Sequence, residues 1–234
     1  MKKPVQDLRI ILFGASGMVG AAVLSECLKD PKVKAVLSVG RKPCGMSHAK
    51  LKELLIPDLF KLESSRQKLK GYNACLFTVG ASATGLNEEG YTKINHDLPI
   101  KTAKLLLKLN KTMSICYVSG GGTDSTEKGP IMWARVKGRT ENDLFKLPFR
   151  AAVMFRLGGL QPLKGFKSST KLYRVAYDLI GPLIPLLVKL FPQWVTTPER
   201  LGRAMLRAAR GESSKNILES KDIYEFGSIN PASE

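Results

Sequence analysis

Short apolar runs recur along the chain as far as about residue 157, and segments of mixed polarity separate them. Runs of about four to eight apolar residues bounded by Gly, Pro or polar residues are typical of strands that are covered on both faces of a parallel sheet. The pattern predicts strands over residues 8–13, 33–39, 53–56, 74–79, 113–118 and 151–156, and a last short strand over residues 216–218.

The segments between these runs have helical periodicity. Helices are expected over residues 21–28, 91–109, 131–145, 198–210 and 222–226. The second of them should be kinked at Pro99, because proline removes a helical N–H donor. Strands that alternate with helices indicate an α/β protein with a doubly wound parallel sheet.

The pattern changes after about residue 158. Residues 172–180 are a short amphipathic helix candidate, and residues 179–191 are the most apolar stretch of the chain. Gly181 and Pro185 argue against one long membrane-spanning helix there. Two interpretations stay open: the stretch covers a substrate pocket or forms a homodimer contact, which we favour, or it lies in a membrane interface.

The length of 234 residues is sufficient for one substantial core and requires no second domain. We therefore expect a single domain over residues 1–234, in which residues 160–215 form a small C-terminal helical cap beside the substrate.

A glycine-rich turn lies between the first predicted strand and the first predicted helix, with Gly14, Gly17 and Gly20 at regular spacing. Glycines in a strand–turn–helix unit let the backbone approach a pyrophosphate, and the helix N-terminus favours the anion. This context predicts a Rossmann-type fold with a dinucleotide site. Its pyrophosphate contacts are expected at Gly14, Ala15, Ser16, Gly17, Met18 and Val19.

The identity of the dinucleotide depends on the end of the second strand. An NAD site usually has an acidic residue there, which holds the ribose hydroxyls. This chain has Arg41 and Lys42 instead, and both can pair with a 2′-phosphate. NADP(H) is therefore favoured over NAD(H).

The formal net charge of +17 and the pI of about 9.8 have two explanations. One is a nucleic-acid or anionic-membrane partner; the other is a generally basic surface. Basic residues are scattered over residues 61–70, 101–111, 164–174 and 200–210 without a nucleic-acid-binding motif, so we favour the second. The arginines of the last cluster recur at helical spacing and predict a solvated basic face: Arg200, Arg203, Arg207 and Arg210.

The four cysteines include no C-x-x-C pair, which predicts free thiols in a reducing compartment. His48 and His96 have no further ligand at metal-site spacing, so no metal is expected. The basic start of the chain meets no apolar stretch of the kind that a secretory signal contains. A cytoplasmic location is therefore the default expectation.

Several blocks together resemble the short-chain dehydrogenase/reductase superfamily, in particular its atypical branch of Tat-interacting-protein-like oxidoreductases and their bacterial relatives. The blocks are residues 14–20, 40–42, 75–80, 117–119, 136–138 with Glu141, 155–159 and 217–219. They cover nearly the whole chain and imply the same Rossmann-type fold.

The resemblance implies proton chemistry by a Tyr-x-x-x-Lys pair on the helix over residues 131–145. Lys137 matches the lysine, whereas Trp133 occupies the tyrosine position and Gly120 the serine position. An indole does not titrate in the range of water, so Trp133 cannot act as the general acid or base. The expected catalytic residues are Lys137, Ser119 and Thr123, with Thr123, Tyr91 or a bound water as the alternative proton donors.

The resemblance also implies cofactor contacts beyond the glycine-rich turn. They are Lys137 at the ribose, Asp58 and Leu59 at the adenine, Thr78, Val79, Gly80 and Ala81 at the middle of the cofactor, and Gly158, Gly159 and Leu160 at the nicotinamide. Asn95 either anchors a water near the lysine, as in some relatives, or is an ordinary polar residue of its helix.

Two functions from different classes follow. The first is an NADP-dependent oxidoreductase that acts on a small carbonyl or alcohol compound with a non-standard proton donor. The second is a non-catalytic protein that senses NADP(H) and regulates a partner, which the residues at positions 120 and 133 favour.

Overall fold

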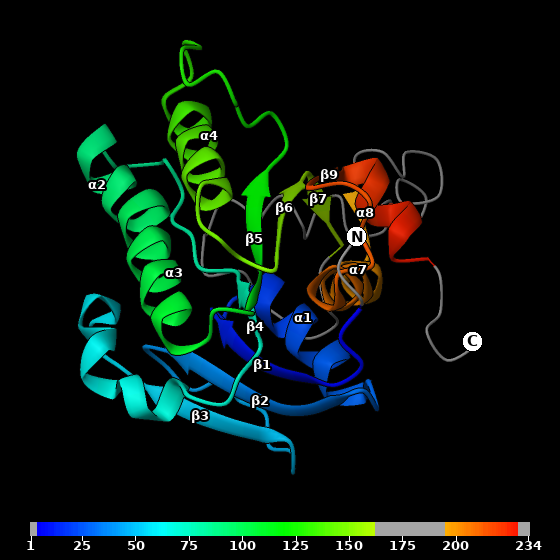
Figure 1. Cartoon of the computed structure of the whole chain (residues 1–234). Helices are drawn as coiled ribbons and strands as arrows, with labels where there is room; N and C mark the ends of the chain where they lie inside the picture. Colours follow the sequence, from blue (N-terminus) through cyan, green and yellow to red (C-terminus); the bar gives the residue numbers. More distant parts are fainter. Residues whose placement is uncertain (1–3, 162–194, 229–234) are drawn as a thin grey trace.

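The computed structural model describes residues 4–161 and 195–228 (Figure 1). Within them one seven-stranded parallel sheet has the order β3-β2-β1-β4-β5-β6-β9. The strands are β1 Leu8–Phe13, β2 Val33–Gly40, β3 Leu51–Leu55, β4 Ala74–Phe77, β5 Ser114–Gly120, β6 Ala151–Leu157 and β9 Ile217–Glu219. This order confirms the doubly wound Rossmann-type sheet, in which the order of the parallel strands reverses between β1 and β4.

Two helical layers cover the sheet, because alternate residues of each buried strand are apolar on both faces. On one face lie α1 Met18–Lys29, α7 Pro198–Arg210 and α8 Ser220–Phe226. On the other lie α3 Leu98–Leu109, α4 Met132–Phe145 and the 3₁₀ helix η1 Leu59–Leu69. The short helix α2 Glu88–Thr92 precedes α3 in the same column (Figure 1).

The structure differs from the sequence-based expectation in detail. Strand β3 begins at Leu51, two residues before the expected start, and η1 was not expected. A small two-stranded sheet of β7 Gly159–Leu160 and β8 Val195–Thr196 was not expected either. These elements are short or weakly periodic, so their hydrophobic pattern contains little information.

The helix expected over residues 91–109 begins earlier and contains a widened turn, η2 Lys93–Asp97. Pro99 lies directly after this turn and cannot donate to the carbonyl of Asn95, four residues before it. That carbonyl instead accepts hydrogen bonds from Tyr117 Oη at 3.0 Å and Thr140 Oγ1 at 2.9 Å. The irregularity thus ties this helix column to β5 and α4.

The expected cap over residues 160–215 is described only at residues 160–161 and 195–215. The helix candidate over residues 172–180 and the apolar stretch over residues 179–191 lie outside the described residues. In the part of the chain that the structure describes, no helix is long and apolar enough to cross a membrane.

Candidate nucleotide site

The glycine-rich turn connects β1 to α1 at the carboxyl edge of the sheet. Gly14 adopts a positive φ of +90°, and a Cβ atom there would lie 2.7 Å from Thr78 Oγ1. A Cβ atom on Gly20 would lie 2.1 Å from the carbonyl oxygen of Gly14. Both positions therefore require glycine for the turn itself, since no side chain fits there.

Gly17 is different, because a Cβ atom there would meet only the Gly14 carbonyl oxygen at 3.4 Å. Gly17 is the N-cap of α1, and no side chain caps the first turn of this helix within the described residues. The unpaired N–H groups of a helix N-terminus favour an anion. These features suit the pyrophosphate contacts that the sequence predicts at this turn, and those contacts stay a prediction.

A pocket of about 190 Å³ lies at the same edge of the sheet. Predicted cofactor residues from three separate segments meet in it: Arg41, Asp58, Leu59, Val79, Gly80 and Ala81. Its remaining lining residues are Pro57, Phe60, Ile94 and Leu98. Sequence reasoning missed these four, because Phe60 belongs to the unexpected η1 and Ile94 to the widened turn.

The predicted residues differ in how they face this pocket. Arg41 lines it and is exposed, whereas Lys42 is exposed but does not line it. The side chain of Asp58 accepts a hydrogen bond from Phe60 N at 3.0 Å and so caps η1. Thr78 lies outside the lining and donates its hydroxyl to the Phe13 carbonyl at 2.6 Å, which joins the ends of β4 and β1.

Asn95 fixes one wall of the pocket. It is fully buried; its Oδ1 accepts from Ala81 N at 3.1 Å, and its Nδ2 donates to the Tyr91 carbonyl at 3.1 Å. Its backbone carbonyl accepts the hydroxyl of Tyr117 and lies 2.9 Å from Thr140 Oγ1, whose proton is shared with the Val136 carbonyl at 2.8 Å. The amide of Asn95 therefore positions the segment that contains Ala81.

Lys137 extends from α4 toward the end of β5. Its Nζ lies 3.5 Å from the Val118 carbonyl oxygen and 5.5 Å from the centroid of the Tyr117 ring. Burial lowers the pKa of Lys137 to about 8, and the nearby carboxylate of Glu141 partly opposes this shift. The ammonium group is thus close to its protonation midpoint at neutral to mildly basic pH.

Trp133 packs over the turn that follows β5. A Cβ atom on Gly120 would lie 3.6 Å from Trp133 Cζ3 and 3.9 Å from Lys137 Cδ. A Cβ atom on Gly122 would lie 3.6 Å from Trp133 Cη2. The indole therefore lies beside the position at which the resemblance implies a serine, and a side chain at Gly120 would fit without a clash.

Ser119 and Thr123 are brought together, but their hydroxyls bond to each other and to the turn. Ser119 Oγ and Thr123 Oγ1 lie 2.8 Å apart, and Thr123 Oγ1 donates to the Gly120 carbonyl at 2.7 Å. Within the described residues, neither hydroxyl forms a hydrogen bond with Lys137. Their catalytic role stays a prediction.

An ion-pair network joins α4 to the strands β6 and β9. The carboxylate of Glu141 has no exposed surface and accepts a hydrogen bond from Arg156 Nε at 3.2 Å. Arg156 Nη1 also donates to the carboxylate of Glu219 at 3.1 Å. Three of the blocks that carry the family resemblance thus meet in one network, on α4, β6 and β9. Sequence reasoning did not foresee this contact, because the partners are far apart in the chain.

The predicted nicotinamide-side segment follows β6. Gly158 N donates a hydrogen bond to Ser220 Oγ at 2.7 Å, and a Cβ atom on Gly121 would lie 3.6 Å from Gly158 Cα. The side chain of Leu160 packs into the core with α7. The segment therefore lies against the turn after β5, beside Trp133.

No protein-family model matches the chain. It is 31% identical over 179 residues to the leucinostatins biosynthesis cluster protein T of Purpureocillium lilacinum, a match to 74% of this chain and 65% of that protein. It is 27% identical over 235 residues to the protein fmp52, mitochondrial, of Emericella nidulans, covering 93% of this chain and 98% of that one. It is 23% identical over 227 residues to the protein HTATIP2 of Rattus norvegicus, covering 95% and 90%.

Solved structures share the fold. The Bordetella bronchiseptica enzyme WbmF, in complex with NAD⁺, matches 95% of this chain and 77% of its own with a TM-score of 0.65 and 14% identity. A short chain dehydrogenase family protein from Francisella tularensis matches 94% of this chain and 95% of its own, with a TM-score of 0.60 and 15% identity.

The expectation of a cytoplasmic location is wrong by the same comparisons, because the Fmp52 relatives from several fungi are named mitochondrial. The expectation depended on the absence of a secretory signal, and that absence does not distinguish the cytoplasm from an organelle such as the mitochondrion. Among the described residues, no group of three or more His, Cys, Asp or Glu side chains could hold a metal ion.

Proposed function

Because this chain is a relative of the HTATIP2 and Fmp52 proteins and has the fold of the short-chain dehydrogenases/reductases, we propose that it is an NADP(H)-dependent oxidoreductase acting on a small carbonyl or alcohol compound. The observation that carries the proposal is the convergence of predicted cofactor residues from three segments on one pocket beside the glycine-rich turn. The expected cap over residues 160–215 would supply the residues that contact the substrate.

The residues present fit a dinucleotide. The open N-terminus of α1 and the room at Gly17 suit a pyrophosphate, and the pocket between Leu59 and Val79 suits an adenine. Gly158, in the segment expected at the nicotinamide, lies against Gly121 of the turn after β5. The fit does not depend on any residue at which this chain departs from the family pattern.

Arg41 supports the choice of NADP(H). It lines the pocket, and no carboxylate is paired with it within the described residues. A guanidinium offers two parallel donors to a phosphate, whereas an acidic residue at this position would repel it.

A bound nicotinamide supplies or accepts a hydride, and the protein must then supply or accept a proton. Trp133 cannot do this. Burial raises the pKa of Tyr91 to about 12, and the Thr123 hydroxyl is bonded within its turn, so both are poor donors. We assign the proton to Lys137 Nζ, whose lowered pKa of about 8 suits general acid–base work.

The same residues also support a second candidate, a non-catalytic NADP(H) sensor. Trp133 and Gly120 replace the tyrosine and serine of the family pattern while the cofactor pocket remains intact. Under the sensor hypothesis, the indole of Trp133 occupies the place of the catalytic tyrosine, and the bound nucleotide regulates a partner.

The first test is a titration of the protein with NADPH and NADH, followed by nicotinamide fluorescence. We expect NADPH to bind more tightly, and Arg41→Ala to weaken NADPH by about tenfold while leaving NADH nearly unchanged. Lys52→Ala, an exposed lysine on β3, serves as the matched control. Absence of binding to either nucleotide would exclude both the oxidoreductase and the sensor.

A second test separates the two candidates. In the double variant Trp133→Tyr with Gly120→Ser, both side chains return to the family pattern, and a Cβ atom at position 120 lies at ordinary contact distance from its neighbours. Carbonyl reduction by the wild-type protein that falls strongly in Lys137→Met supports the oxidoreductase. Activity that is absent from the wild type and arises only in the double variant supports the sensor.

A further inference from the structure

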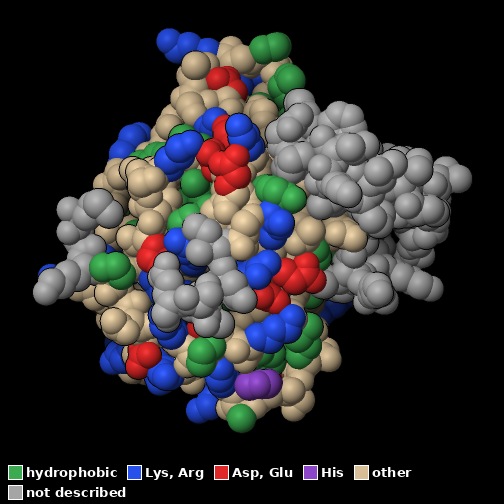
Figure 2. All heavy atoms as spheres, turned by 90° about the vertical axis from the view of Figure 1, so that its right-hand side faces the viewer, with side chains coloured by type: hydrophobic (Ala, Val, Ile, Leu, Met, Phe, Trp, Pro, Cys, Tyr) green, Lys and Arg blue, Asp and Glu red, His purple; other side chains and the backbone are tan. Residues whose placement is uncertain are grey.

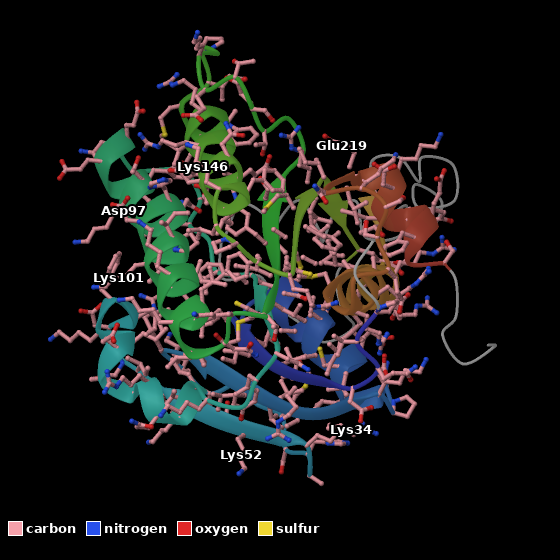
Figure 3. The ribbon with its side chains drawn as sticks, viewed as in Figure 1. Lys34, Lys52, Asp97, Lys101, Lys146 and Glu219 are labelled. Carbon is pink, nitrogen blue, oxygen red and sulfur yellow. The ribbon has the colours of Figure 1, made fainter. Side chains whose placement is uncertain are left out.

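A row of exposed lysines follows the outer side of α3 and the turn before it. We call this row the lysine stripe: Lys93, Lys101, Lys104, Lys108 and Lys111. Lys101, Lys104 and Lys108 are spaced by three and four positions on α3 and so lie on the same side of this helix. Lys93 lies in the widened turn before the helix, and Lys111 follows its end. Figure 3 shows Lys101 on the outer side of the molecule, pointing away from the sheet.

The charge of the stripe is not neutralised by the protein. No ion pair joins any of its lysines to a carboxylate in the described parts of the chain. Asp97 lies among them but contacts His96 Nδ1 at 2.8 Å. The neighbouring η1, beside α3 in Figure 1, adds further exposed basic residues. These are Lys61, Arg66, Lys68 and Lys70, with Glu63 among them.

The face shown in Figure 2 is different. There acidic side chains lie among the basic ones, so charges of opposite sign are close together. The net charge of +17 is therefore not spread evenly, and the outer side of α3 and η1 carries an uncompensated part of it. Such a surface attracts anions over about a Debye length.

An apolar groove opens within the stripe, at the end of α3. It has a volume of about 650 Å³ and is lined by Leu107, Leu147 and Pro148 between Lys104, Lys108 and Lys111. Aliphatic groups surrounded by ammonium groups match a lipid, in which hydrocarbon adjoins an anionic headgroup.

Other occupants fit less well. Surfaces that bind single-stranded nucleic acid combine cations with aromatic rings on which bases stack. Here the ring beside the stripe, Phe60, is already covered by Lys93 and Lys101 at 5.7 and 5.8 Å. A second copy docked two-fold through the same face would bring like charges together. Charge complementarity thus favours a lipid surface.

We infer that the lysine stripe and its groove bind the surface of an anionic phospholipid bilayer. The lysines contact headgroup phosphates, and the aliphatic floor at Leu107 and Leu147 contacts the hydrocarbon next to them. The groove lies at the opposite end of α3 from the pocket residue Leu98, so the lysines around it are separate from the nucleotide pocket.

The test is co-sedimentation of the full chain with vesicles of phosphatidylcholine alone or mixed with phosphatidylserine. We expect binding only to the anionic vesicles, with a strong decrease between about 0.1 M and about 0.5 M salt. The triple variant Lys104→Glu, Lys108→Glu and Lys111→Glu should lose at least about tenfold in affinity.

The matched control reverses exposed lysines elsewhere, Lys32→Glu, Lys52→Glu and Lys128→Glu, and so makes the same change in net charge. It should retain most of the binding. Equal loss in both variants, or retention in the stripe variant, would overturn the assignment. Binding to duplex DNA without binding to anionic vesicles would overturn it as well. Circular dichroism and NADPH titration of both variants show whether the fold and nucleotide site are intact.

Discussion

At the scale of single residues, the proposed proton chemistry depends on Lys137 and its neighbour Trp133. The lysine is held near the Val118 carbonyl and over the Tyr117 ring, in an environment that lowers its pKa to about 8. The indole beside it fills the place of the family tyrosine without titrating. One group on α4 therefore retains a usable proton, and its neighbour does not.

This assignment predicts a pH dependence. The ammonium of Lys137 is present below its pKa of about 8 and is lost as the pH rises through that value. Carbonyl reduction should therefore decrease with a midpoint near pH 8, because the proton donor disappears. The turnover of saturated enzyme measured from neutral to basic pH checks this. A flat profile through that range would contradict the role of Lys137.

At the scale of elements, the turn from β1 to α1 contains two glycines, Gly17 and Gly20, that differ in the space around them. Gly20 faces the Gly14 carbonyl so closely that no Cβ atom fits, whereas Gly17 has room for one. The room at Gly17 is next to the uncapped N-terminus of α1. Gly20 is thus required by packing, whereas Gly17 is free to serve the ligand approach that the proposed nucleotide site needs.

The two glycines should respond differently to alanine. Gly20→Ala is expected to destabilise the fold by about 2 kcal/mol or more, a decrease in Tm of about 4–8 °C, because backbone must move. Gly17→Ala should keep Tm within about 1 °C and weaken NADPH by about tenfold, since the methyl group takes the space of the pyrophosphate. Thermal melts and nucleotide titration check both, and equal effects on stability would contradict the distinction.

At the scale of the whole molecule, an ion pair attaches α7 to the end of α1, and cation–π contacts join α7 to α8. The solvated basic face expected on α7 is wrong in three places. Arg210 is buried and pairs with Asp30 at the end of α1. Arg200 stacks 3.6 Å from the Tyr224 ring centroid, and Arg207 4.2 Å from that of Phe226.

The pair of Arg210 with Asp30 should be important for stability. Asp30→Asn leaves a buried guanidinium without its counter-charge, and this should cost about 3 kcal/mol. Glu225→Gln, which removes the exposed partner of Lys221 at 3.8 Å, should change stability by less than about 0.5 kcal/mol. Urea unfolding followed by circular dichroism measures both, and a small effect of Asp30→Asn would show that the pair is dispensable.

The sequence by itself determined the sheet and the glycine-rich turn. Continuous apolar strands and glycines at fixed spacing are patterns within one short segment, so they can be recognised without knowing which other segments pack against it. The widened turn before Pro99 was foreseen only as a kink, because its cause includes the distant hydroxyls of Tyr117 and Thr140. Short elements such as η1 lacked a periodicity that could predict them.

Only the tertiary structure decided which distant side chains meet. In the folded protein Arg156 contacts both Glu141 and Glu219, and residues of three segments line one pocket. The helix η1 lies beside α3. The basic clusters over residues 61–70 and 101–111 look scattered in the sequence, yet they belong to neighbouring helices of one face. Periodicity reports which side of an element is buried, whereas the partner of a charge depends on how the elements pack.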